Sequence, residues 1–244
     1  MVDTRVQNEI EHGKFIAEKG EEIWNWSSSA GRLRWERRSR VFRNFIGNDS
    51  KKVLEVGCGT GLFTGQLALT NNQIVAIDIS PALLDLAQKR TVFQNVIFKN
   101  EDAHRTSFED QSFDFIVGIS ALHHLDIKLA LKEFFRLLKP GGKIMFTEPN
   151  MLNPQIFIQK NIPFIKKLAG DSPDETAFIK WRLIRILTDF GFKDIIIKNF
   201  DFLHPAIPQF MISYATKVCL AMERLPILKE ISGSLVIKAS KLSI

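Results

Sequence analysis

Short runs of apolar and β-branched residues alternate with longer segments of helical periodicity through the first 150 residues of this chain. Such runs, bounded by turn residues, are typical of buried strands, and the segments between them are typical of helices. The predicted strands cover residues 51–56, 73–78, 95–100, 113–119 and 143–148, and the predicted helices cover 62–70, 80–91 and 126–138. This alternation indicates an α/β fold with a parallel sheet and right-handed crossovers.

Beyond residue 149 the intervals between the predicted strands become longer. Residues 178–190 have apolar positions at helical spacing and end before Gly191, which is typical of a helix C-terminus. Strands are predicted over 194–202 and 234–239. Between them, residues 208–229 form a mostly apolar helical segment with a proline near each end.

The first predicted strand runs directly into a loop with glycine at every second position, Gly57, Gly59 and Gly61. Glycines allow a tight turn and the close approach of a ligand to the main chain, and the following helix directs its amide N-terminus to the same place. This order indicates a nucleotide-like site at the carboxyl end of a parallel sheet. The spacing disfavours a dinucleotide, because Leu62 occupies the last glycine position of that fingerprint. Glu55 would repel a pyrophosphate, whereas it suits a cationic ligand.

The segment E-V-G-C-G-T-G, residues 55–61, resembles motif I of the class I S-adenosylmethionine (SAM) dependent methyltransferases of type 11. Later segments follow in the order of that family: F-D-F-I-V at 113–117, L-H-H-L at 122–125 and L-L-K-P-G-G-K at 137–143. The resemblance covers roughly residues 51–149. It implies a Rossmann-like, doubly wound sheet of seven strands, with strands one to six parallel and strand seven antiparallel between strands five and six.

The resemblance also implies a site for SAM, with S-adenosylhomocysteine as the product. Glu55 would bind the ammonium group, Asp78 the ribose hydroxyls and Asp102 the adenine. The implied cofactor residues are Glu55, Gly57, Cys58, Gly59, Gly61, Asp78, Ile79, Asp102, Ala103 and Ser120. Purely structural roles stay open as alternatives. The loop is then only a strand-to-helix turn, and Asp78 is a helix N-cap, although Ser80 before Pro81 suits the N-cap role better.

His123 and His124 follow the fourth predicted strand and are therefore expected at the cofactor edge. Methyl transfer gains much of its rate from holding the acceptor in line with the methyl group. An oxygen acceptor also needs a base, for which histidine is suited near neutral pH. The two histidines are therefore the catalytic candidates; in the alternative, one packs or caps while the other is exposed. No His/Cys cluster has ligand spacing, so the sequence predicts no metal site.

The chain is predicted to be a single domain over residues 1–244. Its parts are an N-terminal helical lid over 1–45 with Trp24, Trp26 and Trp35, a SAM-binding core over 46–149, and insertions over 150–177 and 203–233. The insertions leave the ends of strands five and six and therefore rise on the cofactor edge. Their apolar residues predict an apolar or lipid-like acceptor, methylated on oxygen or carbon; in the alternative they only cover the sheet and each other.

Lysine and arginine exceed the acidic residues by six, and this excess is spread along the chain. It is compatible with peripheral contact with anionic lipid, whereas no RNA-binding module appears. The arginines between Arg32 and Arg43 are typical of a solvated helix face, and Ser120–His123 replace the Asn/Asp-Pro-Pro-aromatic motif of nucleic-acid amino-methyltransferases. Nucleic acid is therefore disfavoured. An RNA or protein methyltransferase and a non-catalytic SAM-binding subunit remain the alternatives.

The two cysteines, Cys58 and Cys219, suggest no disulfide framework. No apolar run reaches the roughly 18 residues of a membrane-spanning helix, and the N-terminus is too polar for a signal peptide. These features predict a cytoplasmic enzyme, peripheral at the membrane if its lids contact lipid. They leave the oligomeric state open.

Overall fold

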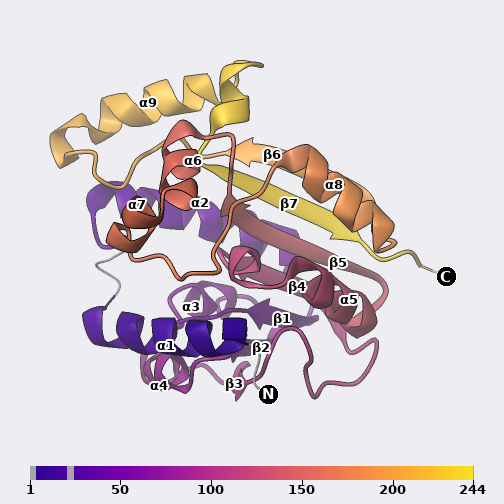
Figure 1. Ribbon diagram of the computed structural model, residues 1–244. Helices are drawn as coiled ribbons and strands as arrows, with labels where there is room; N and C mark the ends of the chain where they lie inside the picture. The colour runs from indigo at the N-terminus through magenta and orange to yellow at the C-terminus, as the bar shows by residue number, and fades with distance from the viewer. Residues whose placement is uncertain (1–3, 21–24, 244) are drawn as a thin grey trace.

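The computed structural model describes residues 4–20 and 25–243, so Trp24 lies outside the described residues. They contain a sheet of seven strands in the order β3-β2-β1-β4-β5-β7-β6 (Figure 1). The strands are β1 (Lys52–Val56), β2 (Gln73–Asp78), β3 (Val96–Asn100), β4 (Phe113–Ile119), β5 (Leu138–Pro149), β6 (Lys193–Phe200) and β7 (Ser234–Ser240). Pairs from β3 to β5 are parallel, whereas β7 pairs antiparallel with β5 and β6. The predicted fold class is confirmed.

Helices cover both faces of the sheet because successive strand residues point to opposite faces. On one face, Leu54 and Ile116 pack with α5 (Ile127–Leu137) and α8 (Lys180–Asp189). On the other face, Val53 and Val117 pack with α2 (Ser29–Ile46) and α3 (Thr64–Leu67). The strand that leads into the glycine loop therefore contributes to both cores, which explains its nearly continuous apolar sequence.

Helix α2, which belongs to the predicted lid over residues 1–45, also packs on one face of the sheet. Phe42 and Ile46 are almost fully buried against the strands, so α2 is a layer of the core. Helix α1 (Thr4–Lys19) instead lies across the strand-end edge and packs along α4 (Pro81–Arg90). Gly13 permits this contact, because a Cβ there would lie 2.4 Å from Ser80 Oγ. Ser80 is the N-cap of α4, as predicted.

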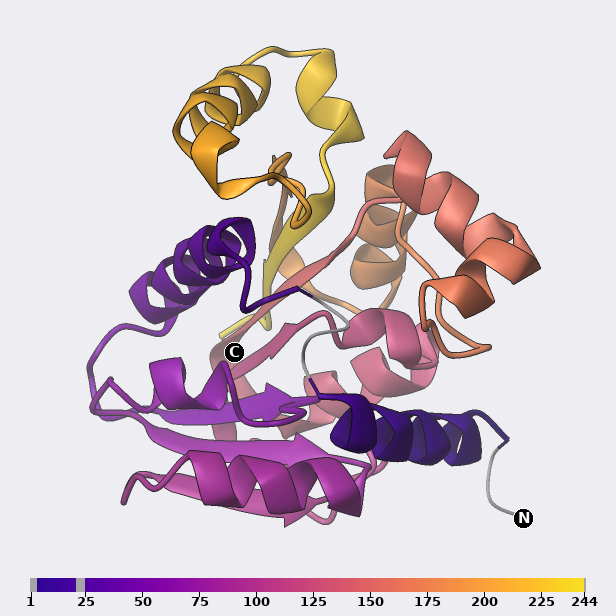
Figure 2. The same cartoon turned by 90° about the vertical axis from the view of Figure 1, so that its left-hand side faces the viewer.

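The two insertions form short helices that bury little. Helices α6 (Pro154–Asn161) and α7 (Pro163–Leu168) contain no buried residue, and α9 (Ile212–Met222) buries only Cys219, which packs with Ala30 of α2. Figure 2 looks onto the edge where the parallel strands end, and α1, α6, α7 and α9 surround it.

Two predicted helices are shorter in the structure. The helix predicted over 208–229 is divided into a 3-10 turn at Gln209–Met211, helix α9 and a second 3-10 turn at Leu228–Ile231. Pro226 lies in the break, where it cannot donate to a helical hydrogen-bond ladder. The helix predicted over 62–70 is reduced to α3.

Candidate active site

A cavity of about 680 Å³ opens at the edge where the parallel strands end. The glycine loop and the residues that follow β2, β3 and β4 line it from the sheet. Residues of α1, α2 and α6, together with the segments 169–175 and 201–205, line it from the other elements. The N-terminal segment and both insertions therefore meet over the strand ends, but α9 itself does not line the cavity.

The glycine loop has two different faces. Gly57 and Gly59 line the cavity with positive φ angles of 66° and 54°, and a Cβ on Gly59 would meet no heavy atom within 4 Å. That Cβ would project into open cavity space. Gly61 instead faces α4, where its Cβ would lie 3.0 Å from Ala87. Gly61 does not line the cavity and serves helix packing, while Cys58 lines it with the other two glycines.

Asp78 ties the glycine loop to the end of β2. Its Oδ2 accepts a hydrogen bond from the Gly59 amide at 2.8 Å, and its Oδ1 accepts one from the Ser80 amide at 2.9 Å. Burial raises the pKa of Asp78, and the two amides oppose that rise. Asp78 and the next residue, Ile79, both line the cavity. The carboxylate therefore shapes the loop as well as the cavity.

Glu55 does not reach the cavity. It is buried on β1, and its Oε2 has no hydrogen-bond partner in the described part of the chain. Burial raises the pKa of Glu55 to about 8; the Thr64 hydroxyl lowers it, and the charge of Asp78 raises it. The structure does not bring this predicted ammonium ligand to the cavity wall.

Asp102 lies on the cavity after β3 and is held by a neighbour that the sequence analysis missed. The Asp126 amide donates to His104 Nε2 at 2.9 Å, so His104 Nδ1 carries the hydrogen that bonds Asp102 Oδ1 at 2.7 Å. Burial raises the pKa of Asp102, but the hydrogen bonds from His104 lower it more. Ala103 also lines the cavity, as does Ser120, whose φ of 54° is unusual for a residue with a side chain.

His123 forms a dyad with Glu148 of β5. Glu148 accepts hydrogen bonds from the amides of Ala121 and Leu122 at 3.0 and 2.9 Å, and its Oε2 lies 2.7 Å from His123 Nδ1. A carboxylate in this position fixes the hydrogen on Nδ1 and leaves Nε2 as the acceptor nitrogen. Burial lowers the pKa of His123, with the charge of His124 adding to this effect, and Glu148 only partly offsets them.

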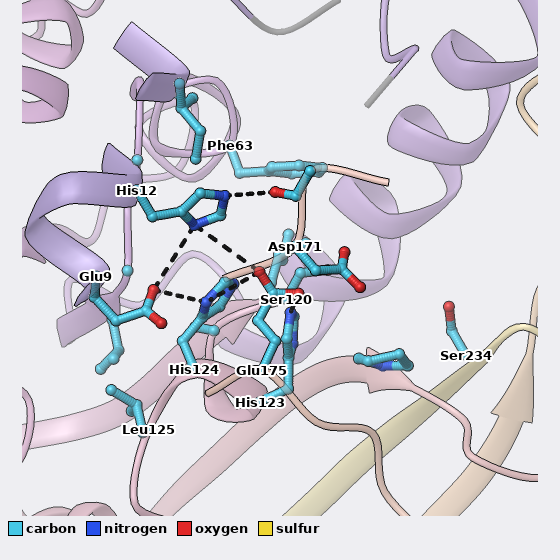
Figure 3. A pocket seen from close by; sticks show the side chains of 18 of the residues that line it. Glu9, His12, Phe63, Ser120, His123, His124, Leu125, Asp171, Glu175 and Ser234 are labelled. Carbon is cyan, nitrogen blue, oxygen red and sulfur yellow. Dashed lines mark hydrogen bonds and ion pairs between the residues drawn. The ribbon is translucent and has the colours of Figure 1, made fainter. Parts of the chain in front are cut away.

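His124 belongs to a second group, the four-residue cluster of Glu9, His12, His124 and Glu175 (Figure 3). Its Nδ1 lies 2.8 Å from Glu9 Oε2 and 3.7 Å from Glu175 Oε1. Burial lowers the pKa of His124, but the hydrogen bond with Glu9 and the nearby carboxylates raise it to about 9. His12 Nε2 lies 2.8 Å from the carbonyl oxygen of Gly170.

The sequence analysis found the two histidines but missed the residues around them. Glu9 and His12 come from α1, and Glu175 comes from the segment after α7, where Lys160 of α6 pairs with it. No single window of the sequence contains these residues. A pair at i and i+3 on one helix, Glu9 and His12, is the only local sign that we find.

Three of the six arginines of α2 pair with acidic residues inside the molecule. Arg34 Nε and Arg38 Nη1 lie 2.7 and 2.6 Å from Asp201 Oδ2, and Arg37 pairs with Glu223 at 2.8 Å. These three arginines therefore do not form the solvated cationic face that the sequence suggested. Their pairing removes the strongest argument for a nucleic-acid surface.

The sheet side of the cavity suits an elongated ligand that carries hydroxyl groups and positive charge. Asp78 and Asp102 present carboxylates after adjacent strands, and Ser120 follows β4. The missing side chain of Gly59 leaves space against the main chain between them. These features fit SAM, and with the antiparallel seventh strand they define a class I SAM-dependent methyltransferase.

Comparison with known proteins assigns the core of the chain to a family. The family model Methyltransf_11, a methyltransferase domain, matches residues 54–146, so this part of the chain is a methyltransferase domain of type 11. Demethylmenaquinone methyltransferases from strains of Staphylococcus aureus are 28% identical over 223 residues, which cover 82% of this chain and 92% of those proteins. The chain is therefore an enzyme that uses SAM as its methyl donor.

Solved structures share the fold. A SAM-dependent methyltransferase from Thermotoga maritima, described as a possible histamine N-methyltransferase, matches with a TM-score of 0.66 at 20% identity, over 94% of this chain and 99% of that one. A phosphoethanolamine N-methyltransferase from Haemonchus contortus, solved with phosphomonomethylethanolamine and S-adenosylhomocysteine, matches with a TM-score of 0.62 at 19% identity. That match covers 85% of this chain and 53% of the Haemonchus chain.

Across residues 4–20 and 25–243, we find no helix with the length and apolar character needed to pass through a membrane.

Proposed function

We propose that this methyltransferase modifies an amphiphilic small molecule, with a hydroxyl-bearing end at the His123–Glu148 dyad. The dyad carries the proposal, because Glu148 orients His123 so that an acceptor nitrogen remains in a buried position on the cavity. The residues that would hold SAM are Gly57, Cys58, Gly59, Asp78, Ile79, Asp102, Ala103 and Ser120. When bound, SAM supplies an electrophilic methyl group on a sulfonium centre.

His123 would act as the proton acceptor. The hydroxyl proton of the acceptor would move to Nε2 while the acceptor oxygen, or a ring carbon activated by it, forms the bond to the methyl group. After attack by a ring carbon, the hydrogen on that carbon would leave as a proton and the oxygen would take back the proton from Nε2. The bond between that methyl group and sulfur breaks, and the electron pair stays on sulfur. Glu148 stabilises the imidazolium that results, which is the usual contribution of a carboxylate behind a histidine base.

The cavity wall changes the predicted acceptor from apolar to amphiphilic. Glu9, Lys160 and Glu175 place charged groups on the side of the lids, where the sequence predicted apolar side chains. Apolar lining is present elsewhere, from Trp26, Phe63, Ile156, Phe202 and Leu203. A quinol with an apolar substituent has both kinds of surface, and relatives named demethylmenaquinone methyltransferases support this acceptor class.

Delivery of such an acceptor from a membrane surface is part of the proposal. More than half of the large apolar side chains exposed in the described residues belong to 154–168 and 209–231, among them Phe164, Leu168, Phe210 and Ile227. The same segments carry exposed Lys167, Lys217 and Arg224, while Glu223 and Glu230 pair with Arg37 and Lys180. Apolar side chains with unpaired positive charge suit an anionic lipid surface. The enzyme would then be cytoplasmic and peripheral at the membrane.

Methyl transfer to a series of quinols and phenols, followed by mass spectrometry, tests the acceptor class. We expect turnover of quinols with an apolar substituent and weaker turnover of the bare head groups. His123→Gln should lower kcat about 10²- to 10⁴-fold, the usual contribution of a general base, with unchanged SAM affinity by calorimetry. A His123→Gln enzyme with wild-type kcat would show that His123 is not the base. Methyl transfer to polar amines only would overturn the proposed acceptor class.

A further inference from the structure

Four metal-binding atoms converge on one side of the cavity. His12 Nδ1 lies 3.9 Å from both Glu9 Oε2 and Glu175 Oε1, and His124 Nδ1 lies 2.8 and 3.7 Å from the same two oxygens. Ligands at about 2.1 Å in a tetrahedron around zinc stand about 3.4 Å apart. The observed distances lie on both sides of that value. Glu9, His12 and His124 each offer a ligand atom within 4.8 Å of the other two. A small shift of side chains would therefore place these three donors around one ion, with Glu175 beside them as the fourth.

The orientation of His12 leaves a donor that needs a cation. A carbonyl oxygen can only accept, so the 2.8 Å contact with Gly170 puts the hydrogen of neutral His12 on Nε2. The lone pair of Nδ1 then faces the carboxylates of Glu9 and Glu175, which also only accept. A proton or a metal ion in the space between these groups would therefore stabilise them.

The local charge balance leads to the same requirement. Four carboxylates, Glu9, Glu148, Asp171 and Glu175, lie in or against the cluster, and the lysine and arginine beside them are Lys160 and Arg5. If the imidazoles are neutral, two negative charges remain among partly buried groups, and uncompensated charge is costly there. One divalent cation neutralises them with all imidazoles uncharged.

Three of the four side chains are also held by a second contact that fixes their direction. Gly170 holds the His12 ring, the Ser172 hydroxyl donates to the other oxygen of Glu9, and Lys160 pairs with the other oxygen of Glu175. Outer contacts of this kind orient metal ligands and set the tautomer of a ligating histidine. They leave Nδ1 of His12 and Oε2 of Glu9 for the ion, whereas Oε1 of Glu175 also accepts a hydrogen bond from the Ser172 amide at 2.8 Å.

We propose that Glu9, His12, His124 and Glu175 form a binding site for a divalent cation of the zinc type. Imidazole and carboxylate donors together suit such an ion better than magnesium or calcium, which favour oxygen ligands alone. The site contradicts the expectation of no metal that the sequence gave. That expectation relied on ligand spacing in the sequence, and these ligands come from α1, from the turn after β4 and from residue 175.

The site would face the acceptor rather than the cofactor. All four residues line the cavity, and the side chains of Glu9, His12 and His124 keep 12%, 12% and 24% of their surface exposed there. An acceptor oxygen could enter the coordination sphere from this side, where the ion would favour its deprotonated form. This role rests on the proposed function; the binding of metal does not.

Zinc binding to the untagged protein, after treatment with a chelator, tests the proposal without any acceptor. Equilibrium dialysis with metal analysis should give one zinc per chain, and X-ray absorption at the zinc edge should show two imidazole ligands. Loss of an outer contact typically costs 10- to 100-fold in metal affinity, so His12→Asn and Glu9→Gln should each weaken zinc binding at least about 100-fold. His204→Asn is the matched control, because it removes an imidazole from the cavity rim outside the cluster.

The outcomes separate the metal site from the proposed function. Circular dichroism and SAM calorimetry on the metal-free variants establish that each one folds and binds its cofactor. Zinc binding that is absent, or equal in wild type and His12→Asn, would overturn the site and leave a proton-balanced ion-pair cluster. A chain that binds zinc as expected but transfers no methyl group to any quinol would instead overturn the proposed function alone.

Discussion

Replacement of Glu55 by glutamine should make the cofactor-free protein more stable in alkaline solution. Glu55 is buried on β1, and burial raises its pKa to about 8, compared with about 4.3 in an unfolded chain. The folded protein therefore binds the proton more tightly than the unfolded chain does. Stability from this group is fully present below pH 4.3 and is lost as the pH rises through about 8.

The size of this effect follows from the interval between the two pKa values. Each pH unit within it costs about 1.4 kcal/mol, so at pH 7.5 the wild type should have lost roughly 4 kcal/mol relative to acidic solution. Glutamine has nearly the same shape and does not titrate. The Glu55→Gln protein should therefore exceed the wild type by about 1 kcal/mol near pH 5 and by about 4 kcal/mol near pH 8.

Urea unfolding between pH 5 and 8.5, without SAM, measures this difference. Glu109→Gln is the control, because Glu109 is exposed and the same charge is removed. The control should shift stability by less than about 0.5 kcal/mol at every pH, as surface substitutions do. Equal pH slopes for wild type and Glu55→Gln would show that Glu55 ionises normally in the fold, and the argument from burial would fail.

Three further changes test other parts of the structure. Gly59→Val should abolish SAM binding in calorimetry, because its side chain would enter the open cavity, and its φ of 54° should cost about 1–2 kcal/mol of stability. Gly61→Val has the same kind of backbone strain and should destabilise the fold further through its 3.0 Å approach to α4. Equal losses of stability in both variants would contradict the two faces of the loop. Asp201→Asn should cost about 3–5 kcal/mol in thermal unfolding at pH 7, because it breaks a buried ion pair. Arg34 and Arg38 hold the pKa of Asp201 at about 2. The wild type should therefore lose the stability that this ion pair gives only as the pH falls from about 3.9 through 2. Phe164→Ser should lower the fraction of protein that sediments with anionic vesicles, whereas the exposed control Val92→Ser should not. Equal losses in both variants would contradict the proposed lipid-facing surface.

The sheet could be predicted from the sequence because its signals are local. Alternating apolar runs set the strands, and the loop at 55–61 with Asp78 sets the cofactor edge. The packing of α2 on the sheet was not predicted, for a physical reason. Arginines are the most frequent residues of this helix, but Phe42 and Ile46, at helical spacing, pack one side of it against the sheet. Arg38 pairs with Asp201, which lies far along the chain. Charge alone could not show whether that helix faces solvent or the core.

The four-residue cluster shows what local signals leave out. Three segments that the sequence treated separately contribute to it: α1, the turn after β4 and the insertion after β5. Each segment alone is typical of a polar surface, where a single glutamate or histidine is common. Only their convergence forces two imidazoles and two carboxylates to share a partly buried volume, where charge must be balanced. The chemistry of the acceptor side therefore depends on how the lid segments pack over the sheet, whereas the cofactor side is encoded locally, in the glycine loop and in the residues that follow β2, β3 and β4.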